Sequence, residues 1–299
     1  MVMYEPCNQF PAASGIAPLV KSGCLFVVMI WSLSACATQE SASPAAVPPT
    51  STMAQPVTAE ADTAPVPTNH RPVAAAPECI KKRLFQVGRI SAWQIQDRQA
   101  FFFLAGMTIA ADGAPDAYHP TDIGTDALGN AGRPGNWWAL VTDNGEPSGK
   151  PLVQKADDPK PGFYISATAL EDRTRPTSDP RRFVDSNTIP YLVLPSNNQG
   201  GARLGDFGVV INRANGRSSP AIFADLGPKN HLGEGSIALA ERLGIPSNPR
   251  RGGVSKNIVY VVFPGSGNGK PRTLAEIERE GAARFAAWGG QPQLDACLP

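Results

Sequence analysis

Residues 205–224 read GDFGVVINRANGRSSPAIFA, in which two apolar runs flank the pair Asn215-Gly216. Asn-Gly is favoured in β-hairpin turns, because both residue types tolerate the positive φ angles that such turns use. The runs are rich in Val, Ile and Phe and have the length of ordinary strands. The stretch therefore predicts a β-hairpin with strands over 205–212 and 220–224.

Short apolar runs separated by turn residues continue over most of the chain after residue 100. Further strands are predicted at 101–105, 107–110, 136–142, 162–166, 189–194 and 258–263. Turn residues such as Asp143-Asn-Gly145 stand between them. The segment from Cys79 to Gln99 has no pattern that assigns it to a strand or a helix.

Two segments have apolar residues at helical spacing. The first, 236–243, begins at a possible Ser236 cap and is followed by Gly244. The second, 273–287, is amphipathic. Many short strands with few helices are typical of β-barrels and sandwiches. We predict a single mainly β, β-barrel-like domain over 79–299 with two short helices.

The start of the chain has the features of an export signal. Lys21 precedes an apolar run of 12 residues, from Cys24 to Ala35, which is too short to span a bilayer and suits a signal-peptide core. Its ending, Leu-Ser-Ala-Cys36, resembles the bacterial lipobox, in which the cysteine is acylated. We predict a lipoprotein signal peptide over 1–35, lipidation of Cys36 and a lipid-anchored location in the cell envelope. The alternative is an ordinary signal peptide or an uncleaved anchor.

Residues 36–78 are rich in Ala, Pro, Ser and Thr, and Arg71 is the only Lys or Arg among them. Such a composition offers too little apolar surface to offset chain entropy, so we predict a disordered spacer. Beyond it, Cys79 and Cys297 are the only cysteines. In an oxidising compartment this pair predicts a disulfide between the ends of the domain.

Charge and motif content exclude several classes of function. The formal net charge is +1, so nucleic acid is not an expected partner. The chain has no Gly-x-Ser-x-Gly elbow, Walker loop or His-Glu-x-x-His motif, and its three histidines and two domain cysteines fit no metal pattern. The segment GSGNG at 265–269 is interpreted as a flexible turn. We expect no metal, no cofactor and a monomer.

Two carboxylates remain as candidates for catalysis. Asp225 follows the predicted strand 220–224, and an eight-residue loop leads to Glu234, just ahead of the predicted helix 236–243. A strand end and a helix start joined in this way can place both acids on one cleft. Glycoside hydrolysis needs such a pair, one to protonate the leaving oxygen and one to activate water. A turn or cap role for Asp225 is the alternative.

The segments Ala221-Ile-Phe-Ala-Asp225 and Gly233-Glu-Gly-Ser-Ile-Ala-Leu-Ala240 resemble the signature of glycoside hydrolase family 75, the fungal-type chitosanases. The stretch ADGAPDAYHP at 111–120 is also similar to that family. The resemblance spans roughly residues 101–267. It implies that Asp225 and Glu234 are the catalytic pair and that cleavage proceeds with inversion.

Five further residues are candidates for substrate binding. Each could instead be structural: Asp112 in a turn, Tyr118 and His119 beside it, Trp138 next to Trp137, and His231 between the two acids. If Trp137 and Trp138 lie in a strand, one ring packs in the core and the other can stack on a sugar.

The function predicted from these features is a lipid-anchored, endo-acting glycoside hydrolase that cleaves a glucosamine-containing polysaccharide. A helix N-terminus favours an ionised group, which suits Glu234 as the base and Asp225 as the acid, but the resemblance does not fix these roles and the reverse assignment stays open. Between residues 100 and 265, 16 Asp and Glu balance 16 Lys and Arg, so a neutral glycan such as peptidoglycan stays open. The alternatives are a non-catalytic glycan- or peptidoglycan-binding lipoprotein and a structural envelope protein.

Overall fold

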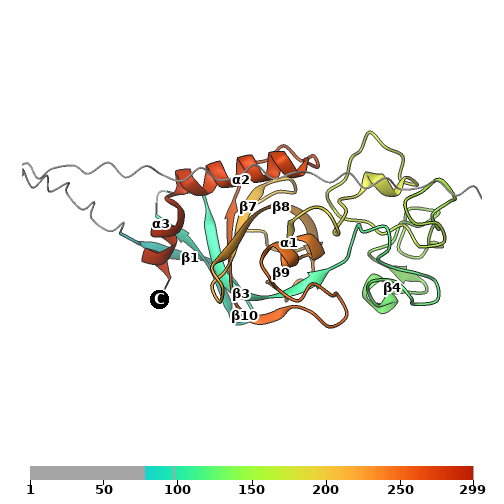
Figure 1. Ribbon diagram of the computed structural model, residues 1–299, viewed down its shortest axis with the longest axis horizontal. Helices are drawn as coiled ribbons and strands as arrows, with labels where there is room; N and C mark the ends of the chain where they lie inside the picture. The colour runs from blue at the N-terminus through green and yellow to red at the C-terminus, as the bar shows by residue number, and fades with distance from the viewer. Residues whose placement is uncertain (1–77, 97, 299) are drawn as a thin grey trace, which may run out of the picture. The chain divides into compact units, whose positions relative to one another are not determined.

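The computed structural model describes residues 78–96 and 98–298 (Figure 1). The predicted signal peptide, Cys36 and the predicted spacer up to residue 77 lie outside the described residues. Within the described ranges, no helix is both long and apolar enough to cross a membrane.

Six strands close into a barrel in the order β3-β10-β7-β8-β6-β9, and β9 pairs back onto β3. The pairs β6–β8 and β3–β9 are parallel, and the other neighbours are antiparallel. The predicted mainly β, barrel-like fold is thus confirmed. The barrel strands are β3 (Phe101–Ala110), β6 (Tyr191–Pro195), β7 (Phe207–Asn212), β8 (Arg217–Gly227), β9 (Glu234–Ser236) and β10 (Val254–Phe263).

The hairpin predicted around Asn215-Gly216 is present as strands β7 and β8, which pair from Phe207↔Ile222 to Asn212↔Arg217. Its loop has four residues, and Gly216 takes a φ of 74° that suits glycine. The two predicted runs 101–105 and 107–110 join into the single strand β3, with Gly106 inside it. A side chain at Gly106 would lie 2.4 Å from the Val254 carbonyl oxygen, so glycine permits the close approach of β10.

Two parts of the sheet differ from the prediction. The unassigned segment after Cys79 forms a hairpin, β1 (Lys81–Val87) and β2 (Ile90–Ile95), which pairs with the start of β3. The strands predicted at 136–142 and 162–166 are wrong. They reduce to the short pair β4 (Gly132–Arg133) and β5 (Asn136–Trp137) and to single bridges such as Leu140↔Ser166.

Long strands do not form in this region because prolines and glycines at 147–151 and 161–162 interrupt any continuous ladder of hydrogen bonds. Residues 112–190 are therefore mostly loops, drawn green to yellow beside the barrel (Figure 1). They include two short 3₁₀ helices, η1 (Leu128–Ala131) and η2 (Pro180–Arg182).

Both predicted helices are present, as α1 (Ile237–Arg242) and α2 (Leu274–Trp288). Ser236 caps α1, and Thr273 with Glu276 forms a capping box at α2. A third helix, α3 (Gly290–Cys297), was not predicted. Its first turn contains Gly290 and Pro292, which hide the helical pattern in the sequence, although proline is tolerated there.

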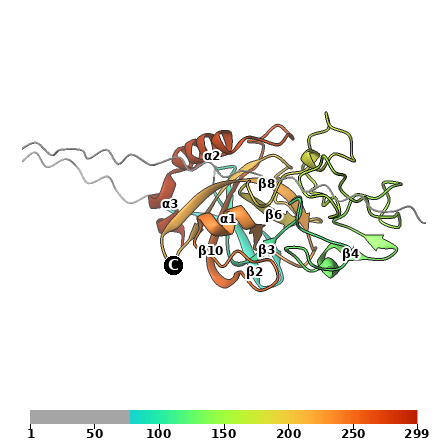
Figure 2. The same cartoon turned by 45° about the vertical axis from the view of Figure 1, so that its right-hand side comes forward.

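The barrel strands are buried on both faces, which is clearest on β10. Ile258, Tyr260 and Val262 pack in one apolar cluster, and the alternate residues Val259, Val261 and Phe263 pack in another. The first cluster includes Leu239 of α1, and the second includes Ile277 of α2. Helix α2 lies along the outside of the barrel (Figure 2), so the first cluster fills the interior.

The glycine-rich turn at 265–269 is hydrogen-bonded to Asp206. The Asp206 carboxylate is buried and accepts hydrogen bonds from the backbone N–H groups of Gly265 (3.0 Å) and Gly267 (2.7 Å). These N–H groups are thereby engaged within the protein and do not form a phosphate cradle.

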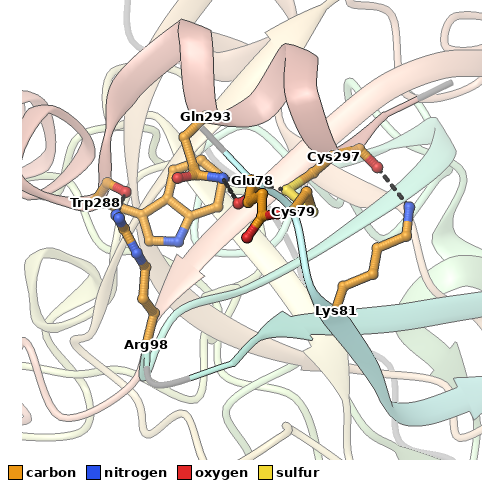
Figure 3. The surroundings of a disulfide bond; sticks show 7 residues. All are labelled: Glu78, Cys79, Lys81, Arg98, Trp288, Gln293 and Cys297. Atoms are coloured by element: carbon orange, nitrogen blue, oxygen red, sulfur yellow. Dashed lines mark hydrogen bonds between the residues drawn. A yellow bond between two sulfur atoms is a disulfide. The ribbon is translucent and has the colours of Figure 1, made fainter. Parts of the chain in front are cut away.

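The predicted disulfide between Cys79 and Cys297 is present, with a Cα–Cα distance of 5.1 Å and a sequence separation of 218 (Figure 3). Hydrogen bonds reinforce the junction: Lys81 Nζ donates to the Cys297 carbonyl, and Gln293 Nε2 donates to the Glu78 carbonyl at 3.4 Å. The start of the folded region is thus fastened to α3, its last helix.

Loss of this bridge should destabilise the domain. In the chain-entropy picture, a closed loop of this length contributes at most about 5 kcal/mol to the free energy of unfolding. We expect the Cys79→Ser/Cys297→Ser double variant to unfold at a lower urea concentration than the wild-type chain. A reductant should lower the wild-type midpoint and leave the double variant unchanged. Equal midpoints for all samples would contradict a stabilising bridge.

Candidate active site

The two acids lie on either side of one residue of the barrel wall. Val193 of β6 pairs with Asp225 of β8 on one side and with Glu234 of β9 on the other. Because neighbouring strands are about 4.8 Å apart, this register separates the two Cα atoms by roughly 10 Å. All three residues line one cleft of about 770 Å³.

A β-bulge sets the position of Asp225. Leu192 pairs with Phe223, but the next residue, Val193, pairs with Asp225, so Ala224 is an extra residue on β8. Bulges of this kind redirect a side chain and are common beside active sites. Asp225 therefore lies within a strand that continues to Gly227, and not at a strand end as predicted.

Hydrogen bonds hold the Asp225 carboxylate in place. Its Oδ1 accepts the backbone N–H groups of Ala169 (2.8 Å) and Leu226 (2.9 Å). The Ala169 loop is itself fastened to β8, because the Leu170 N–H donates to the Ala224 carbonyl at 2.8 Å. The side chain is 9% exposed, so Asp225 is a fixed and nearly buried group.

Glu234 has a different environment. It begins the short strand β9 and precedes the Ser236 cap of α1 by two residues. Its carboxyl group is half-buried and has no hydrogen bond from any residue of the described ranges. A side chain at Gly227 would lie 3.1 Å from Glu234 Oε2, so glycine leaves space beside this carboxyl group.

A third and a fourth carboxyl group share the cleft. The Tyr118 hydroxyl donates to Asp112 Oδ1 at 2.7 Å and lies 3.3 Å from Asp126 Oδ2. Asp126 also accepts from the Ala127 backbone N–H and the Asn130 side chain. Asp126 was not predicted, because nothing in its local sequence distinguishes it from other loop aspartates.

The structure brings most of the predicted binding residues to this cleft. Asp112, Tyr118, Trp138 and His231 line it together with the two acids. His231 Nε2 lies 3.0 Å from Thr108 Oγ1, which joins the loop between the acids to β3. His119 lies elsewhere: its ring contacts Phe163 at 4.8 Å between centroids, and its Nδ1 lies 2.9 Å from Thr121 Oγ1.

The adjacent tryptophans differ in exposure, although strand β5 ends at Trp137 and does not include Trp138. Trp137 is buried and contacts Tyr164, whereas Trp138 is 60% exposed. The Trp138 indole N–H donates to the Asn130 carbonyl at 2.8 Å, which fixes the orientation of the ring. An aromatic face held in this way in a cleft can stack on the apolar face of a sugar.

Burial raises the pKa of both candidate catalytic acids. Burial raises the pKa of Glu234 to about 7, and the nearby charges of Asp225 and Asp126 add to the rise. Burial also raises the pKa of Asp225, to about 6, although its backbone hydrogen bonds oppose the shift. The expectation that the helix favours an ionised Glu234 is therefore wrong. Helix α1 has only six residues, and burial dominates.

Positive charge in the cleft is partly neutralised. Arg250 lines it, but its guanidinium donates to the Asp122 carboxylate (2.8 Å) and to the carbonyls of Asp122, Gly124 and Asp126. Within the described ranges, no group of His, Cys, Asp and Glu side chains is arranged to hold a metal ion.

The raised pKa of Glu234 predicts a pH-dependent cost to stability. The protonated form stabilises the fold below the ordinary pKa, and this contribution is lost as the pH rises through about 7. Glu234→Gln should therefore raise the melting temperature at pH 8 and increase the free energy of unfolding there by roughly 3 kcal/mol. The gain should shrink towards pH 5 in calorimetric scans.

The exposed Glu146 provides the matched control, since Glu146→Gln should change the melting temperature little at either pH. A Glu234→Gln variant that is less stable than wild type at pH 8 would contradict a costly buried charge.

Comparison with known families agrees with the resemblance seen in the sequence. Residues 165–288 match the model of the fungal chitosanases of glycosyl hydrolase group 75. A search of curated proteins gave no match. The matched segment contains every barrel strand except β3, together with Asp225 and Glu234, and begins after Asp112. The resemblance to glycoside hydrolase family 75 is thus confirmed over residues 165–288.

Proposed function

We propose that this protein is a lipid-anchored, endo-acting glycoside hydrolase that cleaves a glucosamine-containing polysaccharide with inversion. The observation that carries the proposal is the pairing of Asp225 and Glu234 across Val193 in one cleft. The match of this segment to a chitosanase family supports hydrolysis of chitosan as the reaction class.

The environments of the two acids favour Glu234 as the proton donor, the reverse of the assignment expected from sequence. Glu234 has the higher pKa, about 7, and no hydrogen bond within the described residues that would stabilise its charge. Asp225 accepts two backbone N–H groups, which stabilise a carboxylate. A donor with a raised pKa and an ionised partner is the division of roles that glycosidases use.

The reaction then follows from these roles. Glu234 gives its proton to the glycosidic oxygen as the bond from the anomeric carbon to that oxygen breaks. Asp225 takes a proton from a water molecule, whose oxygen attacks the anomeric carbon from the opposite side. Inverting enzymes need room for this water between the carboxyl groups. The separation of the two acids by a whole strand is consistent with that requirement.

The cleft also has features that suit a cationic glycan. Four carboxyl groups line it, more than hydrolysis needs, although the charges of the surrounding sequence balance. The four cannot all be ionised at once, but the negative charge that they retain would attract protonated amino groups of glucosamine units. The volume, about 770 Å³, lies within the range of clefts that enclose a drug-sized ligand, so more than one sugar unit can bind beside Trp138.

The hydrolase proposal predicts that Asp225→Asn and Glu234→Gln each reduce the rate of cleavage by about 10²–10⁴-fold, because each removes an acid–base group. The chain should be incubated with chitosan, chitin and peptidoglycan and the products analysed by mass spectrometry. Nuclear magnetic resonance of fresh products should show the anomer opposite to that of the substrate.

Asp185→Asn is the matched control, because Asp185 is a half-buried aspartate that does not line the cleft. It should cleave like wild type. Wild-type protein that binds the polymer without releasing products would overturn hydrolysis and favour a glycan-binding lipoprotein.

The lipid anchor predicts that Cys36→Ser moves the protein from the membrane fraction to a soluble or uncleaved form. Wild-type protein should incorporate a labelled fatty acid, and the variant should not. Cys24→Ala, which changes the signal core and leaves Cys36 in place, should remain lipidated. Equal labelling of the Cys36→Ser variant and wild type would exclude Cys36 as the lipidated residue.

A further inference from the structure

The cleft contains two adjacent arginines, Arg250 and Arg251, which the protein uses differently. Arg250 donates to the Asp122 carboxylate at 2.8 Å and to the Asp126 carbonyl at 2.9 Å. The side chain of Arg251 is exposed and makes no hydrogen bond or ion pair with any residue that the structure describes. The guanidinium of Arg251 is therefore free to bind a ligand that enters the cleft.

Contacts of the backbone set the position of Arg251. Its loop joins α1 to β10 (Figure 1). The Asn248 carbonyl accepts the backbone N–H groups of Arg251 at 3.2 Å and of Gly252 at 2.6 Å. Gly253 follows with a φ of 88°, and a side chain there would lie 2.4 Å from the Met107 carbonyl oxygen. The loop thus packs closely against β3 just after Arg251.

The strand order places this loop apart from Asp225. Glu234 on β9 faces Asp225 across Val193 on one side, and it pairs with Thr108 of β3 on the other. Gly253 lies against the same part of β3. Because neighbouring strands are about 4.8 Å apart, Gly253 is roughly 10 Å from Glu234, on the side away from Asp225. The barrel wall therefore presents Asp225, Glu234 and then the loop of Arg251.

Arg251 and the acids of the cleft do not neutralise one another. Among the described residues, none of the four carboxyl groups of the cleft forms an ion pair with Arg251, although an arginine side chain is long and flexible. The cleft consequently has a negative part and a positive part. A purely cationic polymer such as chitosan would be attracted by the first and repelled by the second.

A guanidinium group matches a carboxylate particularly well. Its planar N–H groups can donate two parallel hydrogen bonds to the two oxygens of one carboxylate. The four acids of the cleft suit amino groups, as described above. A ligand that satisfies both parts of the cleft therefore carries positive and negative groups on one chain. The balance of acidic and basic residues around the cleft, 16 of each between residues 100 and 265, agrees with such a ligand.

We propose that Arg251 is a specificity-determining residue that binds a carboxylate of the substrate, which is a glycan with carboxylates as well as amino groups. Cleavage of this glycan rests on the proposed hydrolase function, whereas its binding at Arg251 can be measured separately.

The proposal is tested by comparing chitosan with O-carboxymethyl chitosan of the same chain length. Arg251→Gln should lower kcat/KM for the carboxymethylated polymer by about tenfold, because a charge-assisted pair is lost. The same variant should not lower kcat/KM for chitosan. Arg251→Lys keeps the positive charge and should recover part of the loss. Added sodium chloride should reduce the difference between wild type and Arg251→Gln.

Arg89→Gln is the matched control, since Arg89 is an exposed arginine in the turn between β1 and β2 and does not line the cleft. It should leave kcat/KM unchanged for both polymers. The melting temperature of Arg251→Gln should equal that of wild type, because the Arg251 side chain supports no other described residue. A lower melting temperature with equal losses on both polymers would mean a structural role and would overturn the proposal.

Binding is measured without cleavage in the full chain that carries Glu234→Gln. Calorimetric titration with oligomers of O-carboxymethyl chitosan should give a Kd that rises about tenfold when Arg251→Gln is added. Oligomers whose carboxylates have been converted to amides should bind equally to both proteins, because the charged partner of Arg251 is then absent.

The outcomes separate the two proposals. If wild type cleaves neither polymer while the Kd depends on Arg251 and on the carboxylates, the hydrolase function fails and the role of Arg251 stands. If wild type cleaves chitosan but neither cleaves nor binds the carboxymethylated polymer, the hydrolase function stands and the role of Arg251 is overturned. It is equally overturned if Arg251→Gln changes neither kcat/KM nor Kd for the carboxymethylated glycan.

Discussion

The cleft gathers four carboxyl groups, Asp112, Asp126, Asp225 and Glu234, where contact with water is limited. Each ionised group raises the free energy of ionising the next, so the four cannot all be charged near neutral pH. Differences in hydrogen bonding then decide where the charge lies. Asp225 has two backbone donors and Glu234 has none from the described residues, which makes two chemically similar groups unequal.

The barrel makes this arrangement possible through a short strand. β9 has three residues, yet it pairs with β3 on one side and with β6 on the other. It closes the barrel and places Glu234 at a fixed register from Val193 and Asp225. The close approach depends on Gly233, whose φ is 110° and whose missing side chain would lie 2.7 Å from the Gly106 carbonyl oxygen. The pairing of β9 with β3 and β6 therefore both closes the barrel and sets the position of Glu234 in the cleft.

Local patterns in the sequence were sufficient for the features that depend on local structure. The hairpin around Asn215-Gly216 and helices α1 and α2 were predicted in this way, and the disulfide was predicted from the number of cysteines. What could not be predicted depends on tertiary contacts. The strand β9 is too short to show alternation, and the β-bulge at Ala224 exists only relative to β6. Asp126 enters the cleft because the Tyr118 hydroxyl and Asn130 lie beside it, a relation that no local spacing indicates.

The assignment of acid and base shows the same limit. A helix start next to Glu234 suggested a stabilised charge, since backbone N–H groups at a helix N-terminus favour anions. In the folded protein Ser236 Oγ accepts the Leu239 N–H at 3.1 Å, and Glu234 lies two residues earlier in a strand. The N–H groups that stabilise a carboxylate are instead those of Ala169 and Leu226, at Asp225. A hydrogen bond between residues 56 positions apart in the chain thus favours the ionised form of Asp225, because a pKa depends on the neighbours in space and not on those in sequence.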